Sequence, residues 1–188
     1  MHERLMESVR PLLQTGKKVS LGILLETDVP FLFSVINDPD VHRYLSNPGR
    51  MMYEHEELEW VRTLGQKEQD SRHFAIVENS SAEIVGVVGV REINFSNGSG
   101  VLGYFLAKGS WGRGYSTEAV SLAVEFCFGT LNLRKLVSAV FEPNTASMRV
   151  LVKNGFKECG RYHKHSFVRG HGFVDDVLFE KFNEGHSL

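Results

Sequence analysis

A glycine-rich turn at residues 108–119 constrains the fold more than any other segment. It reads Lys-Gly-Ser-Trp-Gly-Arg-Gly-Tyr-Ser-Thr-Glu-Ala and joins an apolar strand pattern to a helical one. A helix N-terminus carries unpaired N–H groups and a partial positive charge, so such a turn suits a phosphate or pyrophosphate. Gly112 and Gly114 lack the Cβ atoms that would hold a ligand away. The turn therefore predicts an anion site and leaves the anion open.

Two well-known phosphate loops match this turn poorly. A P-loop of this spacing would need a lysine where Tyr115 stands. A dinucleotide fingerprint would need a third glycine at Thr117, and it would follow a strand of a parallel sheet. Here the preceding strand belongs to a hairpin signalled by Asn97-Gly98. A glycine turn without any ligand is the remaining alternative.

Hydrophobic periodicity predicts one mixed α/β domain over residues 1–188, with a polar lead-in at 1–18 and a core at 19–182. We expect about four helices, which begin at Thr27 or Asp28, at Glu54, at Thr117 and after Asn144. We expect them to end near residues 37, 67, 128 and 154. The expected strands cover residues 19–25, 73–77, 84–93, 101–107, 136–141, 157–168 and 173–182.

Composition excludes several classes of function. The formal net charge of −2 gives no electrostatic basis for binding nucleic acid or an anionic membrane. No apolar run is long enough for a membrane span or a signal peptide. The two cysteines provide no disulfide framework, and the eight histidines show no metal-ligand spacing. We expect a cytoplasmic protein that binds neither nucleic acid, membrane nor metal.

A second motif follows the strand at 136–141. Residues 142–156 read Glu-Pro-Asn-Thr-Ala-Ser-Met-Arg-Val-Leu-Val-Lys-Asn-Gly-Phe. Together with the glycine turn, and with shorter matches at 84–86, 102–104 and 175–176, it resembles the GNAT superfamily of acetyltransferases over residues 19–182. Within that superfamily it is most similar to the branch that acetylates the N-termini of ribosomal proteins. The resemblance implies a mostly antiparallel twisted sheet with one bulged, splayed strand.

The resemblance also implies acetyl-CoA as co-substrate, an amine as acceptor, and a monomer or homodimer. It implies that the pantetheine arm lies along the backbone of Phe105, Leu106 and Ala107. Asn144 matches a residue that hydrogen-bonds this arm, and it is equally suited to capping a helix. The expected pyrophosphate-binding residues are Gly112, Arg113, Gly114, Tyr115, Ser116 and Thr117. Arg113 would supply charge in place of the Gln or Arg that the family has where Gly109 stands, and a solvated arginine is the alternative.

The catalytic residues are less evident. Many family members have a tyrosine, which protonates the leaving thiolate, where this chain has Leu151. Ser147 matches the serine proposed for that role in the ribosomal-protein branch, and helix capping is the alternative. The family's two usual positions for a glutamate base hold Val101 and Ser166 here. A two-residue turn at 97–98 would pair Glu92 with Gly103, which makes Glu92 the candidate base; a solvated carboxylate at the strand edge is the alternative.

The resemblance leaves the acceptor open. An α-amine, with a pKa near 7.8, is partly neutral at pH 7, whereas a lysine amine is almost wholly protonated. A weak base therefore favours the N-terminal amine of a protein. A small amine such as a polyamine or an aminoglycoside is the alternative, since four glutamates gather at Glu54, Glu56, Glu57 and Glu59. A non-catalytic acyl-CoA-binding module is a third possibility.

Overall fold

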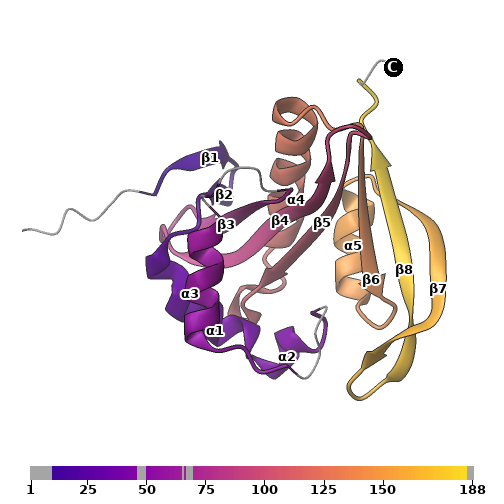
Figure 1. Cartoon of the computed structure of the whole chain (residues 1–188), viewed down its shortest axis with the longest axis horizontal. Coiled ribbons are helices and arrows are strands. Elements are labelled where there is room, and N and C mark those ends of the chain that lie inside the picture. The colour runs from indigo at the N-terminus through magenta and orange to yellow at the C-terminus, as the bar shows by residue number, and fades with distance from the viewer. Residues whose placement is uncertain (1–9, 46–49, 65, 67–69, 186–188) are drawn as a thin grey trace, which may run out of the picture.

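An eight-stranded open sheet organises the part of the chain that the structure describes. The computed structural model describes residues 10–45, 50–64, 66 and 70–185. The strands lie in the order β1-β2-β3-β4-β5-β6-β8-β7 (Figure 1). They are β1 (Leu12–Thr15), β2 (Val19–Gly22), β3 (Arg72–Glu78), β4 (Ile84–Asn94), β5 (Ser99–Leu106), β6 (Lys135–Phe141), β7 (Lys157–Val168) and β8 (Gly172–Phe182). Every neighbouring pair is antiparallel except β5 and β6.

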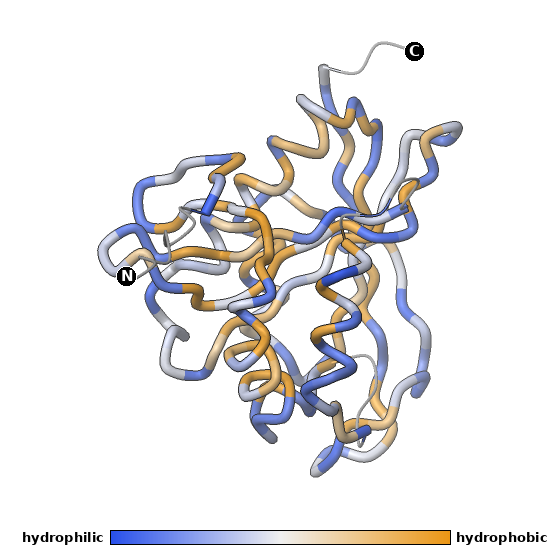
Figure 2. The backbone as a smooth tube through the Cα atoms, turned by 60° about the vertical axis from the view of Figure 1, so that its left-hand side comes forward, coloured by the Kyte–Doolittle hydropathy of each residue, from blue (hydrophilic) through white to orange (hydrophobic). Residues whose placement is uncertain are grey.

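Helices cover both faces of the sheet. They are α1 (Val29–Ile36), α2 (Pro39–His42), α3 (Glu54–Thr63), α4 (Tyr115–Glu125) and α5 (Thr145–Lys153), with short turns η1 (Glu26–Asp28), η2 (Lys108–Ser110) and η3 (Phe126–Thr130). The larger core lies between the sheet and α4 and α5, and a smaller one lies under α1 and α3. Apolar segments accordingly gather on the inner sides of these elements (Figure 2). The predicted mixed α/β domain is confirmed.

The sheet opens between β5 and β6. These two strands pair only where Ser99–Val101 lies beside Lys135–Val137. Beyond that point they diverge, so the rest of β5 has its hydrogen-bonded partner on the β4 side alone. The predicted splayed strand is therefore present. The divergence leaves main-chain groups of β5 facing a gap, at the edge nearest α4 and α5.

Some predicted element boundaries were wrong, and one short helix was not predicted. The lead-in contains strand β1, which pairs with β2. The helix predicted over residues 54–67 ends at Thr63. Helix α1 ends near residue 37 as predicted, but Asp38 and Pro39 then begin the short helix α2, because the Asp38 side chain accepts a hydrogen bond from the Asp40 N–H.

The register predicted for the β4–β5 hairpin was also wrong. Gly103 pairs with Gly89, three residues away from the expected partner Glu92. The Asn94 side chain accepts a hydrogen bond from the Asn97 N–H at 2.8 Å and closes a longer turn, with a register shift between Arg91 and Asn94. A slip of three residues is odd, so it places Glu92 on the other face of the strand. Its backbone is left-handed (φ 53°), and its side chain is 62% exposed.

Candidate functional site

The glycine turn leads directly into α4 and keeps the helix N-terminus open. Gly114 is the N-cap residue with φ 84°, and Gly112 has φ 75°. A Cβ at Gly112 would meet nothing within 4 Å, and one at Gly114 would meet only the Lys18 ammonium. The first α4 hydrogen bond runs from the Glu118 N–H to the Gly114 C=O. The preceding N–H groups of residues 115–117 are thus left for an anion.

Glu118 anchors this turn to the N-terminal hairpin. Its carboxylate accepts hydrogen bonds from the N–H groups of Lys17, Lys18 and Val19 at 2.5, 2.9 and 3.2 Å. The Lys18 ammonium donates in turn to the Arg113 C=O at 3.0 Å. The carboxylate therefore joins the β1–β2 turn to the first turn of α4, so its role extends beyond compensation of the helix dipole.

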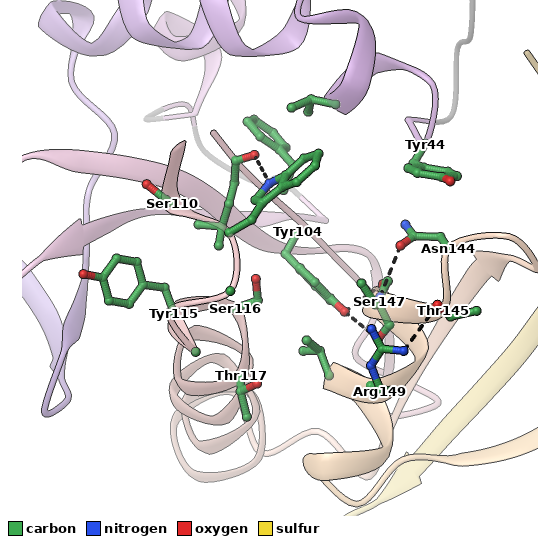
Figure 3. A pocket seen from close by; sticks show the side chains of 18 of the residues that line it. Tyr44, Tyr104, Ser110, Tyr115, Ser116, Thr117, Asn144, Thr145, Ser147 and Arg149 are labelled. Carbon is green, nitrogen blue, oxygen red and sulfur yellow. Dashed lines mark hydrogen bonds between the residues drawn. The ribbon is translucent and has the colours of Figure 1, made fainter. Parts of the chain in front are cut away.

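A cavity of about 430 Å³ lies between this turn, the end of β5 and the start of α5 (Figure 3). Its lining includes most of the residues predicted to bind cofactor: Phe105, Leu106, Gly112, Gly114, Tyr115, Ser116, Thr117 and Asn144. Ala107 and Arg113 are not among them. The Arg113 guanidinium lies 3.6 Å from Glu78 and over the Tyr115 ring. Arg149 and Lys153 of α5, which the sequence reasoning did not single out, bring positive charge to the cavity instead.

The backbone of β5 faces the gap at alternate residues. The Ala107 N–H donates to the Val85 C=O at 3.0 Å and so points toward β4. Because main-chain groups alternate in direction along a strand, the N–H and C=O of Leu106 point away from β4. The Leu106 C=O accepts a hydrogen bond from the Trp111 indole N–H at 3.0 Å. Of the three residues predicted to hold the pantetheine arm by their main chain, Leu106 is therefore the one that presents its N–H to the gap.

Ser147 meets a tyrosine that the sequence reasoning did not single out. Its Oγ lies 2.8 Å from the Tyr104 hydroxyl, which also donates to the Ser147 C=O at 3.1 Å. Burial raises the pKa of Tyr104 to about 12, against an opposing effect of the Ser147 hydrogen bond. The Ser147 N–H donates to Asn144 Oδ1 at 3.2 Å, so Asn144 caps α5 as predicted.

A second cavity, of about 750 Å³, lies on the opposite side of this pair. It is bounded by α3, β4 and β5 on one side and by β6, β7 and β8 on the other. Gly89 and Gly103 form part of its floor, and a Cβ at Gly103 would meet nothing within 4 Å. The two cavities share Tyr44, Leu45, Tyr104, Phe105, Asn144 and Ser147. Glu92 lines neither, so the geometry that made it the candidate base is absent.

Two buried carboxylates line the larger cavity. Glu57 of α3 is 2% exposed, and its Oε2 has no hydrogen-bond partner among the described residues. Burial, and then the neighbouring Glu56, raise its pKa. Asp176 of β8 is 8% exposed; its Oδ2 accepts from Ser166 Oγ at 3.0 Å, while Oδ1 has no partner in the described part of the chain.

No group of three or more potential metal ligands occurs among the described residues. Within the same ranges, no helix has the length and hydropathy needed to cross a bilayer.

Comparison with known proteins gives consistent matches. The family model "Acetyltransferase (GNAT) domain" matches residues 22–157. The Bacillus subtilis protein "Probable N-acetyltransferase YjcK" is 32% identical over 86% of this chain and 86% of its own length. A solved structure of RimL, a ribosomal L7/L12 alpha-N-protein acetyltransferase in complex with coenzyme A, superposes with a TM-score of 0.82 at 19% identity, covering 94% of this chain and 100% of that one. Spermidine N-acetyltransferase from Vibrio cholerae, in complex with CoA and spermine, gives a TM-score of 0.78 at 22% identity, covering 89% and 96%.

Proposed function

Because this chain belongs to the GNAT acetyltransferase family, as its two motifs predicted, we propose that it transfers the acetyl group of acetyl-CoA to the N-terminal α-amine of a peptide or protein. The amine attacks the thioester directly, without a covalent enzyme intermediate. Acetyl-CoA is a substrate of this reaction, and the residues around the smaller cavity suit it.

The main support for the proposal is that two cavities adjoin each other at one pair of side chains. Tyr104 and Ser147 line both the cavity beside the glycine turn and the cavity across the sheet. A donor held with its phosphates at the α4 N-terminus can extend its acyl end to this junction. An acceptor in the larger cavity approaches the junction from the opposite side, as direct attack requires.

The donor side offers groups suited to each part of the cofactor. The N–H groups of residues 115–117 and the positive charges of Arg149 and Lys153 suit the phosphates. The gap-facing N–H of Leu106 suits the thioester carbonyl, where negative charge develops in the transition state.

The leaving thiolate needs a proton. Ser147 Oγ and the Tyr104 hydroxyl are hydrogen-bonded to each other at the junction. In the proposed reaction Ser147 donates its proton to the sulfur, and the tyrosine hydroxyl replaces it from the other side. Because burial raises the pKa of Tyr104 to about 12, the tyrosine stays protonated at neutral pH.

The charges of the larger cavity suit a peptide. Arg50 and Arg91 line it together with three carboxylates. Guanidinium groups suit the carbonyl and carboxylate groups of a peptide, and carboxylates suit its α-ammonium. A volume of about 750 Å³ also exceeds what one slender amine fills. The single α-ammonium of a peptide fits this mixed lining.

A polyamine acceptor is the second candidate, favoured by one observation. After Arg50 has paired with Glu56, and Arg91 with Glu92, the carboxylates of Glu57 and Asp176 remain without a cationic partner among the described residues. Two such carboxylates suit a substrate with two ammonium groups. The Vibrio cholerae structure that contains spermine has the same fold.

An acceptor panel separates these alternatives. Each reaction contains acetyl-CoA and one amine, and free thiol is measured over time. The decisive peptides form a matched pair: one has a free α-amine, and the other has a blocked α-amine and a free lysine. We expect steady thiol release with the first peptide only. A larger kcat/KM for spermidine than for every peptide would establish the polyamine activity instead, and binding of acetyl-CoA without release for any amine would identify a non-catalytic module.

A variant at the cavity floor controls for acceptor access. In Gly103→Val the added side chain enters open space on the side of the larger cavity. We expect the fold and acetyl-CoA affinity to be kept while kcat/KM for the acceptor falls about tenfold or more. Equal kcat/KM in this variant would place the acceptor elsewhere.

A further inference from the structure

The larger cavity has a carboxylate on each side of its floor. Glu57 comes from α3, which packs over the β3–β4 side of the sheet, and Asp176 comes from β8, beyond the gap between β5 and β6. Both side chains are more than nine-tenths buried, and each has one oxygen without a partner among the described residues. Both line the same cavity as Ser147.

A buried carboxylate oxygen without a hydrogen-bond donor is costly, and natural proteins keep such groups mainly where a ligand or a reaction uses them. The cations of the cavity do not serve these two groups. The Arg50 guanidinium lies 2.6 Å from Glu56, and Arg91 is paired with the exposed Glu92. A ligand ammonium, with three donors, can supply what both carboxylates lack.

We propose that Glu57 and Asp176 bind the acceptor ammonium between them, and that Glu57 is the general base that deprotonates it. This assignment rests on the proposed acetyl transfer and names the groups that act on the amine in that reaction. Asp176 is held in one orientation by the Ser166 hydroxyl, which suits it to anchoring the amine. Burial raises the pKa of Glu57 toward neutrality, which suits that group to accepting a proton.

The proton balance of the step is complete. The acceptor ammonium gives one proton to Glu57 Oε2, and the neutral nitrogen then attacks the thioester carbonyl carbon. The C–N bond forms, the C–S bond breaks, and the thiolate receives a proton from Ser147. The nitrogen loses its second proton through the hydrogen-bonded hydroxyl pair, which restores Ser147. Glu57 releases its proton to solvent, so each cycle yields one amide, one free thiol and one proton.

Ser166 of β7 holds the carboxylate of Asp176 in place. Its hydroxyl donates to Asp176 Oδ2 on the neighbouring strand at 3.0 Å. Both residues line the larger cavity, so Ser166 acts as a positioning residue for Asp176.

The test compares Glu57→Gln and Asp176→Asn with Glu59→Gln, a matched control on an exposed position of α3 outside the lining of either cavity. We expect Glu57→Gln to lower kcat about 10²–10⁴-fold, as loss of a general base does. We expect Asp176→Asn to raise KM for the amine about 10- to 100-fold, as loss of a charged hydrogen bond does. Glu59→Gln should change neither constant by more than about twofold.

Calorimetric affinity for acetyl-CoA verifies folding, and it should match the wild type in all three variants. Glu57→Gln should also lose the acidic limb of the pH profile of kcat. The other titratable and charged groups facing this cavity stay in place in the variant: Tyr44, Arg50, Glu56, His73, Arg91, Tyr104, His165 and Asp176. Retention of that limb, or kcat and KM within about threefold of wild type in both variants, would overturn the assignment.

Failure of the proposed acetyl transfer can be distinguished from failure of the assignment of Glu57 and Asp176. If the wild-type protein binds acetyl-CoA but releases no thiol with any amine in the panel, acetyl transfer is refuted and the assignment of Glu57 and Asp176 is refuted with it. Normal wild-type turnover with unaffected variants refutes the assignment alone.

Discussion

Replacing Glu118 with alanine tests whether its carboxylate fixes the phosphate turn. In the folded protein this side chain accepts three main-chain hydrogen bonds, from Lys17, Lys18 and Val19. A Cβ at Gly16 would come within 2.8 Å of one Glu118 oxygen, so the β1–β2 turn approaches the carboxylate closely. Alanine removes the acceptor of all three N–H groups; those of Lys17 and Lys18 are left to water, and that of Val19 is left buried.

The expected loss follows from the exposure of these three bonds. The bonds from Lys17 and Lys18 are solvent-exposed, so each contributes about 0.5–1 kcal/mol. The third bond comes from Val19, which is fully buried, and contributes about 1–1.5 kcal/mol. The total is about 2–3.5 kcal/mol. A carboxylate that only complements the helix dipole would contribute about 0.3–1 kcal/mol.

Urea unfolding of the wild type and Glu118→Ala measures this difference directly. For a chain of this size, the expected loss corresponds to a decrease in Tm of about 5–10 °C. Glu125→Ala, at an exposed position near the other end of α4, serves as a control in which stability should hold. A loss below about 1 kcal/mol for Glu118→Ala would refute the anchoring role and leave only the dipole effect.

Three further predictions concern the site. Gly114→Val should raise the Kd for acetyl-CoA at least about tenfold, because φ 84° strains any L side chain and the Cβ stands where the phosphates approach; an unchanged Kd by calorimetry would contradict this. Ser147→Ala and Tyr104→Phe should each lower kcat more than they raise KM for acetyl-CoA, and the double variant should be little worse than the poorer single one; fully additive losses would separate their roles. Glu57→Gln should raise the Tm at pH 7, because burial raises the pKa of Glu57 and the wild type loses stability as pH rises through that pKa. This gain should vanish below about pH 4.5, the ordinary value, and a gain independent of pH would exclude the carboxyl as its cause.

Local sequence signals predicted much of the donor side. The helix begun by Asn144 occurs as expected and ends near residue 154. The expected pyrophosphate-binding residues other than Arg113 line the smaller cavity, because the turn itself places consecutive backbone amides there; their binding role stays a prediction. Features of this kind depend on residues a few positions apart, so the sequence specifies them directly.

The register of one hairpin depended on a contact that the dipeptide signal did not reveal. Asn97-Gly98 favours a two-residue turn, but the Asn94 side chain competes by accepting a hydrogen bond from the Asn97 N–H. The resulting turn pairs Asn94 with Ser99 and slips the register by two residues, which keeps each side chain on its face. The further one-residue shift between Arg91 and Asn94 moved Glu92 to the other face and removed the geometric basis for its role as base.

Glu57 illustrates how a functional candidate can be found within a uniform cluster. Four glutamates lie within the first six residues of α3, and their clustering was linked to a small amine acceptor without distinguishing one glutamate from another. Glu57, however, lies four residues before the buried Val61, so helical spacing places it on the apolar face. Charged side chains are almost never fully buried without a partner, so a carboxylate on the apolar face of a helix indicates a functional residue. Its counterpart Asp176 lies far along the chain, in β8, and only the order of strands brings it to the same cavity. The helical spacing of α3 could have identified Glu57 from the sequence. Its pairing with Asp176 could not be predicted, because it depends on the order of the strands in the folded sheet.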